Sequence, residues 1–269
     1  MKIAVAGGRQ VWYRKEMKVA GPISSFFQKH ARPWSKGVSA LLWPRQCRLC
    51  GSFPEEGSFL CGACWEELSL VTAGDYCRRC GRSVGPFGRL GGGCGYCEQE
   101  RILTDGILRA GRYDSVLRQM LLRLKFQEMT EFAPFLGPLL KSVFETRPWG
   151  PIDYLVPVPL HWLRRLQRGF NQSFLLAKEM ADSGVPICRD LVRIRYTRRQ
   201  WTLTDAQRRR NVKGAFAVRR RHPFEGRTVC LVDDITTSRA TLNECARVLK
   251  RAGAEKVYAV VAAASDTLG

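Results

Sequence analysis

The stretch VCLVDDITTSRATL, residues 229–242, decides the fold because it joins an apolar run to a predicted helix through two acids. Asp233 and Asp234 come directly after the apolar run, which predicts a buried strand that ends in a pair of carboxylates. A hydroxyl-rich turn leads from them into a helix over residues 240–251, and Gly253 is its C-terminal stop. Acids at the carboxyl end of a strand face the crevice where open α/β sheets bind ligands. The stretch therefore predicts an α/β fold with a ligand site at this strand.

The turn and the start of the helix together indicate an anion site. The first amides of a helix have no partner within the helix and lie at the positive end of its dipole, so they suit a phosphate group. Paired carboxylates would suit the vicinal hydroxyls of a ribose, and a hydroxyl-lined turn would suit a 5′-phosphate. The alternative is a plain helix cap beside two acids, which is a common arrangement.

Strands and helices alternate along the second half of the chain. Two helices are expected over residues 116–126 and 132–144. After them we expect a strand at 153–158, a helix at 170–180, a strand at 228–232, a helix at 240–251 and a strand at 256–262. Strands that are nearly continuous in Val, Ile and Leu predict a parallel sheet with helices on both faces.

Eight of the eleven cysteines form four C-x-x-C pairs. The pairs are Cys47 and Cys50, Cys61 and Cys64, Cys77 and Cys80, and Cys94 and Cys97. Two such pairs complete a tetrahedral zinc site with no open position, so we expect two structural zinc ions in a small zinc-ribbon domain. Sequential and interleaved pairing are both open, and a disulfide framework or a redox pair are the alternatives. Cys188, Cys230 and Cys245 have apolar neighbours and are expected in the core.

Composition and charge narrow the class of protein. The chain has 269 residues, 45% of them hydrophobic, which allows one or two domains with a sizeable core. Its net charge of +20 is concentrated in residues 1–46 and 193–221, and such density suits phosphate esters, nucleic acid or a lipid surface, or else a solubilising surface. No apolar run approaches the roughly 18 residues of a membrane span. The first 33 residues lack a secretory signal and are expected to form a disordered tail, unless Met17 is the true start.

The stretch 229–242 resembles the phosphoribosyl-pyrophosphate (PRPP) signature of type I phosphoribosyltransferases. From about residue 38 to the C-terminus, the chain is also similar to the ComF family. The motifs that carry this resemblance follow the eight cysteines in chain order: Leu124-Lys125-Phe126, Leu155-Val-Pro-Val-Pro-Leu-His161, Arg164, Arg168-Gly-Phe-Asn-Gln172, Gln200-x-x-Leu203 and Arg208-x-x-Asn211-x-x-Gly214-Ala215-Phe216. Their combination in this order is what makes the resemblance specific.

The ComF resemblance implies a double zinc ribbon on a type I phosphoribosyltransferase-like domain. The implied division is a basic, disordered extension at 1–37, the double zinc ribbon at 38–102 and the transferase-like domain at 103–269. It implies a cytoplasmic glycosyltransferase that binds PRPP with Mg²⁺ and acts in DNA uptake during natural transformation, with single-stranded DNA or DNA-uptake proteins as further partners. The acceptor substrate and the oligomeric state do not follow from it.

Transferred residue by residue, the resemblance implies that Asp233 and Asp234 are the catalytic pair and hold the ribose hydroxyls. The residues that would bind the phosphates of PRPP are Thr236, Thr237, Ser238, Arg239, Ala240, Thr241, Arg164 and Arg168. Residues 195–213 would form a mobile hood over the site. Arg239 and Thr202 stand where the family usually has Gly, so the Arg239 guanidinium either reaches the phosphate or the side chain distorts the loop.

A second class of function stays open, a single-stranded DNA-binding or assembly adaptor with a regulatory or inactive PRPP pocket. Tyr196 and Trp201 lie within the basic stretch and would stack on bases. A cluster of arginines would either stabilise a leaving pyrophosphate or form a solvated loop: Arg193, Arg195, Arg198, Arg199, Arg208, Arg209 and Arg210. His161 is a candidate general base by position only.

Overall fold

The computed structural model describes residues 46–55, 58–85, 93–197 and 203–266. The chain divides into two compact units, residues 1–36 and 37–269, and every described residue lies in the second unit. The expected tail therefore lies outside the described residues. Among the helices that are described, none combines the length and the apolar character needed to cross a bilayer.

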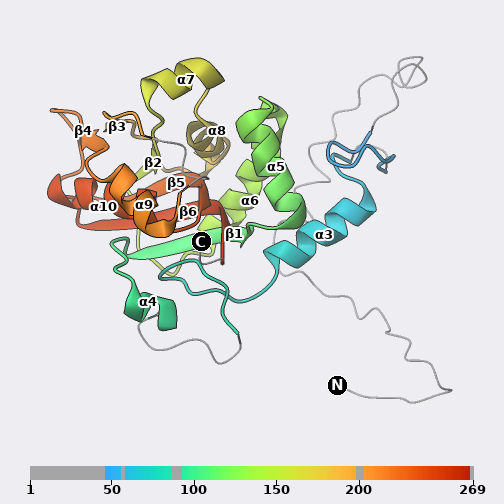
Figure 1. Cartoon of the computed structure of the whole chain (residues 1–269), viewed down its shortest axis with the longest axis horizontal. Helices are drawn as coiled ribbons and strands as arrows, with labels where there is room; N and C mark the ends of the chain where they lie inside the picture. The colour runs from blue at the N-terminus through green and yellow to red at the C-terminus, as the bar shows by residue number, and fades with distance from the viewer. Residues whose placement is uncertain (1–45, 56–57, 86–92, 198–202, 267–269) are drawn as a thin grey trace. The chain divides into compact units, whose positions relative to one another are not determined.

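A four-stranded parallel sheet forms the centre of the fold, in the order β1-β6-β5-β2 (Figure 1). Its strands are β1 (Gly106–Arg112), β2 (Tyr154–Pro157), β5 (Thr228–Thr236) and β6 (Lys256–Ala264). β5 and β6 lie between the other two strands and are buried along almost their whole length. The predicted parallel sheet is confirmed, and β1 is a strand that the sequence did not predict.

Alternate residues of β5 divide the core into two layers, because successive side chains of a strand point to opposite faces. Cys230 and Val232 join one layer, and Val229 and Leu231 join the other. The helices of the first layer are α5 (Ser115–Phe126), α6 (Ala133–Glu145) and α8 (Gln172–Glu179), and the second layer has α10 (Ala240–Arg251). Helices thus cover both faces of the sheet, and their bounds lie close to the predicted ones.

β5 continues to Thr236, so the prediction that the strand ends at Val232 is wrong. Asp233 and Asp234 stay within the strand because β6 pairs with it as far as Thr236, which is opposite Ala264. The backbone of both acids is therefore held by the sheet rather than by a loop.

A separate two-stranded antiparallel sheet precedes β5 in the chain. It consists of β3 (Leu191–Arg193) and β4 (Phe216–Val218), with α9 (Asp205–Val212) between them in sequence. The side chain of Thr204 and that of Gln207 form a capping box that begins α9. A further short helix, α7 (Trp162–Arg168), follows β2.

The cysteine-rich segment packs directly on the main fold. It contains α3 (Gly62–Thr72) and α4 (Gly95–Gln99), and Leu68 of α3 lies in the same core layer as α5. The backbone of Gly111 in β1 approaches α3 so closely that a Cβ atom would lie 2.9 Å from the carbonyl oxygen of Val71. The division of the chain at residues 37 and 102 stays a prediction.

Candidate functional site

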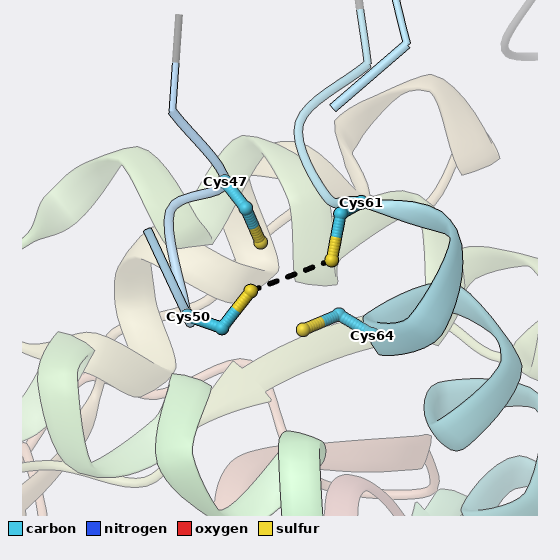
Figure 2. A group of neighbouring side chains, drawn as sticks. All are labelled: Cys47, Cys50, Cys61 and Cys64. Carbon is cyan, nitrogen blue, oxygen red and sulfur yellow. Dashed lines mark hydrogen bonds between the residues drawn. The ribbon is translucent and has the colours of Figure 1, made fainter. Parts of the chain in front are cut away.

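The cysteines of the C-x-x-C pairs form two separate clusters of free thiols. The first cluster is Cys47, Cys50, Cys61 and Cys64, whose side chains point toward one another (Figure 2), and the second is Cys77, Cys80, Cys94 and Cys97. In each cluster the sulfur atoms lie within 4.8 Å of one another. Neighbouring pairs share a cluster, so the pairing is sequential and the interleaved alternative is wrong.

The sulfur geometry fits zinc. A tetrahedron of thiolates with Zn–S bonds of about 2.3 Å places its sulfurs about 3.8 Å apart. The sulfurs of Cys50 and Cys61 are 3.4 Å apart, and those of Cys80 and Cys94 are 3.6 Å apart. Hydrogen bonds to Ser52 lower the pKa of Cys50 to about 6, whereas burial and the neighbouring thiols raise the pKa of Cys64, so the four sulfurs are close enough to affect one another's ionisation. The two clusters therefore support the predicted structural zinc.

Arginines of the main fold hold the backbone of both clusters. Nη2 of Arg123, in α5, donates to the carbonyl of Leu49 at 2.7 Å, between the first two cysteines. Nη1 of Arg109, in β1, donates to the carbonyl of Gly81 at 2.9 Å, directly after Cys80. Each cluster is thereby attached to an element of the main sheet or of the helices that cover it.

Asp233 and Asp234 lie side by side near the carboxyl end of β5, and both are buried. Oδ1 of Asp233 accepts a hydrogen bond from the hydroxyl of Ser173 at 2.8 Å and another from the amide of Asp234 at 2.9 Å. Oδ2 of Asp234 lies 3.1 Å from Nζ of Lys125. Ser173 is in α8 and Lys125 is near the end of α5, so two helices of the first layer converge on the pair.

The two carboxyls have opposite pKa shifts. Burial and the neighbouring charge of Asp234 raise the pKa of Asp233 to about 8. Burial acts on Asp234 as well, but the ammonium of Lys125 outweighs it and holds the pKa of Asp234 below its ordinary value. At neutral pH Asp234 therefore carries the negative charge of the pair, and Asp233 keeps a proton.

The loop at residues 236–241 joins this pair to α10. The side chains of Thr236 and Ser238 are buried, and α10 begins at Ala240. Oγ1 of Thr237 accepts a hydrogen bond from Nη1 of Arg208 at 3.3 Å, so an arginine of α9 reaches this loop. The predicted phosphate-binding residues from Thr236 to Thr241 thus stand between the acids and the N-terminal amides of a helix.

The guanidinium of Arg239 does not lie with the other predicted phosphate-binding groups. It points into the second cysteine cluster, where Nε donates to the carbonyl of Cys80 at 2.8 Å. The backbone of Arg239 is left-handed, with φ at 58°, so the residue keeps the conformation that a glycine would adopt most easily. The loop therefore keeps its backbone conformation with arginine at this position, and the side chain contacts the second cysteine cluster.

Arg164 and Arg168 lie in α7 and are engaged within the protein. Nη2 of Arg164 donates to the carbonyl of Thr197 at 2.6 Å, and Nη1 of Arg168 donates to Oε1 of Gln172 at 2.7 Å. The charge of Arg168 also lowers the pKa of Asp234, though less than Lys125 does, so its guanidinium is within electrostatic range of the acid pair. Of these two arginines, only Arg168 contributes to the lowered pKa of Asp234.

His161 caps the start of α7, and its Nδ1 accepts a hydrogen bond from the amide of Leu163 at 3.3 Å. Burial lowers the pKa of His161, and the charges of Arg193 and Arg164 lower it further. The lowered pKa favours the neutral imidazole at physiological pH. Its role as a base stays a prediction.

Several arginines of the predicted cluster form contacts within the protein. Arg198, Arg199 and Trp201 lie outside the described residues. Nη2 of Arg195 donates to the carbonyls of Asn211 and Lys213, and Arg209 forms an ion pair with Glu100 at 3.0 Å. These contacts give Arg195 and Arg209 a structural role besides any role toward an anion.

Two residues at the site, Lys125 and Ser173, were not assigned there from the sequence, and Arg193 was predicted only as one member of the arginine cluster. Lys125 entered only as part of a family motif, and its distance of 3.1 Å from Asp234 makes it the direct counter-ion of the pair. Ser173 was not singled out from the sequence, although Gln172 directly before it belongs to a motif of the family resemblance. The Nε of Arg193 is buried without a hydrogen-bond partner, which the sequence did not indicate.

Comparison with known proteins gives one family model and several relatives. Residues 38–99 match the model described as a double zinc ribbon domain. "DNA utilization protein YhgH" of Salmonella typhi is 33% identical over 82% of this chain and 95% of its own length. "Competence protein F" of Haemophilus influenzae is 29% identical over 74% of this chain and 87% of its own length. "Competence protein ComFC" of Bacillus subtilis is 29% identical over 72% of this chain and 79% of its own length.

Among solved structures, similar chains include an amidotransferase and a phosphoribosyltransferase. The glutamine PRPP amidotransferase of Bacillus subtilis is 23% identical with a TM-score of 0.33, over 49% of this chain and only 26% of its own. The hypoxanthine phosphoribosyltransferase of Trypanosoma cruzi is 18% identical with a TM-score of 0.30, over 50% of this chain and 64% of its own.

Proposed function

This chain belongs to the ComF family, and from that membership we propose that it binds PRPP with Mg²⁺ in the manner of a phosphoribosyltransferase. Its relatives are named as competence and DNA utilization proteins, which supports DNA uptake or use as its setting. The free thiols of both cysteine clusters suit the reducing cytoplasm.

The observation that carries the proposal is the acid pair with a single close counter-ion. Asp233 and Asp234 are both buried, yet only Lys125 lies within ion-pairing distance among the described residues. Buried acids without full compensation are costly and occur mostly at functional sites. Carboxylate oxygens suit both ribose hydroxyls and a Mg²⁺-bearing ligand, so this donor set fits the proposed substrate.

The residues around the pair support a division of labour. The carboxylates of Asp233 and Asp234 would accept hydrogen bonds from the two ribose hydroxyls and fix the sugar ring. The hydroxyls and amides of residues 236–241, with the positive end of the α10 dipole, would hold the 5′-phosphate. Lys125 and Arg168 would then face the pyrophosphate end of the substrate.

In the proposed reaction, a nucleophile bonds to the anomeric carbon while pyrophosphate leaves with the electron pair of the broken C–O bond. Negative charge then grows on the pyrophosphate, and Lys125, Arg168 and Arg208 would stabilise it. Bound Mg²⁺ would supply further charge neutralisation at the same oxygens. The described residues of the predicted hood, 195–197 and 203–213, would exclude water, which would otherwise compete with the acceptor.

Calorimetry of the zinc-loaded full chain with PRPP and Mg²⁺ tests this proposal. We expect binding at a single site, and we expect the double variant D233N/D234N to lose it. The variant D182N changes a surface acid in the turn after α8 and should bind as the unmodified protein does. Absence of heat from the unmodified protein, or equal heat from the double variant, would contradict the proposal.

A second candidate function is single-stranded DNA binding, and two exposed aromatic side chains favour it, Trp162 in α7 and Tyr196 near it. Trp162 is 64% exposed and Tyr196 is 48% exposed, although both are large and apolar. Cζ of Arg164 lies 5.2 Å from the ring centroid of Tyr196, so charge and an aromatic surface occur together. Bases stack on such rings while phosphates pair with arginine. Binding of this kind would weaken steeply with salt, whereas PRPP binding would depend on Mg²⁺ and the acid pair.

A further inference from the structure

Arg239 is an unusual residue at the centre of the phosphate loop. It is only 1% exposed, and it is among the largest side chains that are fully buried. Its φ of 58° places an L-residue with a long side chain in the left-handed region, where a Cβ atom is unfavourable. A conformation of this kind persists only when surrounding contacts compensate for its strain.

The compensating contacts come from the second cysteine cluster and the end of β6. Nε donates to the carbonyl of Cys80 at 2.8 Å, and Nη1 lies 3.4 Å from the carbonyl oxygen of Ser265. Nη1 also donates to the carbonyl of Thr237, which closes the side chain back onto its own loop. Cζ lies 5.2 Å from the ring centroid of Tyr96, which stands between two cysteines of the same cluster.

The buried charge of Arg239 is a second reason to connect this residue with the second cysteine cluster. The ion pairs found among the described residues do not include Arg239, and its Nη2 is buried without a hydrogen-bond partner. A buried guanidinium needs anionic compensation nearby. Four thiolates that bind one Zn²⁺ carry a net negative charge, and the backbone of one of these cysteines is in direct contact with the guanidinium.

We propose that Arg239 is a positioning residue that fixes the phosphate loop against the second cysteine cluster. The side chain of Arg239 forms hydrogen bonds with both the loop and the cluster. The conformation of residues 236–241 therefore depends on whether the second cysteine cluster is folded, although its cysteines lie far away in the sequence. The phosphate role of the loop rests on the proposed function, but the attachment itself does not.

Arg109 provides a matched control, because it holds the same cysteine turn from a different place. Its Nη1 donates to the carbonyl of Gly81 and its Nη2 donates to Oγ of Ser83 at 2.7 Å. Arg109 is buried like Arg239 but lies in β1, outside the phosphate loop. Its replacement should loosen the cluster without acting on the loop directly.

Hydrogen exchange of the zinc-loaded full chain, without any ligand, tests the attachment. R239M keeps the Cβ atom and removes the guanidinium, and we expect the amides of residues 236–241 to exchange about tenfold faster in it. R109M should speed exchange around Gly81 and leave the loop unchanged. Unchanged loop exchange in R239M, or equal loosening of the loop in R109M, would overturn the proposal. Metal analysis of each variant shows whether zinc is retained.

Binding of PRPP with Mg²⁺ to the same variants separates this inference from the proposed function. R239M should bind about tenfold more weakly than the unmodified protein, and R239G should regain part of that loss because glycine adopts a φ of 58° without strain. Equal affinity of R239M and the unmodified protein would show that the loop needs no such support. Absence of PRPP binding in every protein would contradict the proposed function, while the exchange result would still decide the role of Arg239.

Discussion

Replacing Asp233 by asparagine should stabilise the fold, although it removes a residue of the proposed site. The substitution D233N keeps the shape of the side chain, and the new amide oxygen can still accept the hydrogen bonds from Ser173 and from the amide of Asp234. The pKa of Asp233 is about 8 in the folded protein against an ordinary value of 3.8. Folding therefore forces this carboxyl to take up a proton at pH 7, at a cost on the order of 4 kcal/mol.

The sign of the pH dependence follows from the raised pKa. The contribution of Asp233 to stability is fully present below its unfolded pKa and is lost as the pH rises through its folded pKa. The stabilisation by D233N should therefore be smaller at pH 5 and should grow until about pH 8. Urea unfolding of both proteins at pH 5, 7 and 8.5 measures this difference. The other ionisable groups contribute equally to the free energy of unfolding of the two proteins, so their contributions cancel in the difference.

D234N is the matched control and should behave in the opposite way. The pKa of Asp234 is lowered, so the stability that this group provides is present above its unfolded pKa and is lost as the pH falls. Removing its charge leaves Lys125 without a partner and should cost about 1–3 kcal/mol at pH 7, since Lys125 is partly exposed. If D233N is less stable than the unmodified protein, or its effect is the same at every pH, the electrostatic description of the pair is wrong.

Three further predictions concern the ligand, the metal and nucleic acid. PRPP binding should release a proton at pH 7, because the ribose hydroxyls need the ionised pair; calorimetry in buffers of different ionisation enthalpy should give different heats, and identical heats would argue against it. C80S should lower the zinc content of the purified chain by about one ion relative to C188S, because Cys188 is outside both clusters; equal contents by elemental analysis would refute the assignment. W162A and Y196A should each weaken single-stranded DNA binding about tenfold in fluorescence anisotropy, whereas L70A, which truncates an exposed apolar residue of α3, should not; equal effects would leave stacking without support.

The main sheet and its helices followed from local patterns in the sequence. The helix at Ala240–Arg251 has the predicted bounds, because its apolar stripe is regular and Gly253 adopts a left-handed φ of 85° after it. The cysteine spacing likewise led to two clusters, since a C-x-x-C turn is a local structure. In these regions the residues that form the sequence pattern are the same residues that form the helix or the turn.

The remaining elements depend on contacts between distant segments. β1 was missed because Arg109 interrupts its apolar run, and the carbonyl of Gly81 that satisfies this arginine is far away in the chain. α9 was missed because only Val212 of its residues is buried, so it has no apolar face to detect. The direction of Arg239 depends on Cys80, which is 159 residues away. No local pattern in the sequence contains information of this kind.

A crystal structure of the zinc-loaded chain with PRPP and Mg²⁺ tests the proposed site most directly. The ribose hydroxyls should lie within hydrogen-bonding distance of Asp233 and Asp234, with the 5′-phosphate on the amides of residues 236–241. Density for PRPP elsewhere on the protein, or an acid pair that keeps its contacts with Ser173 and Lys125 beside an empty loop at saturating PRPP, would contradict the assignment.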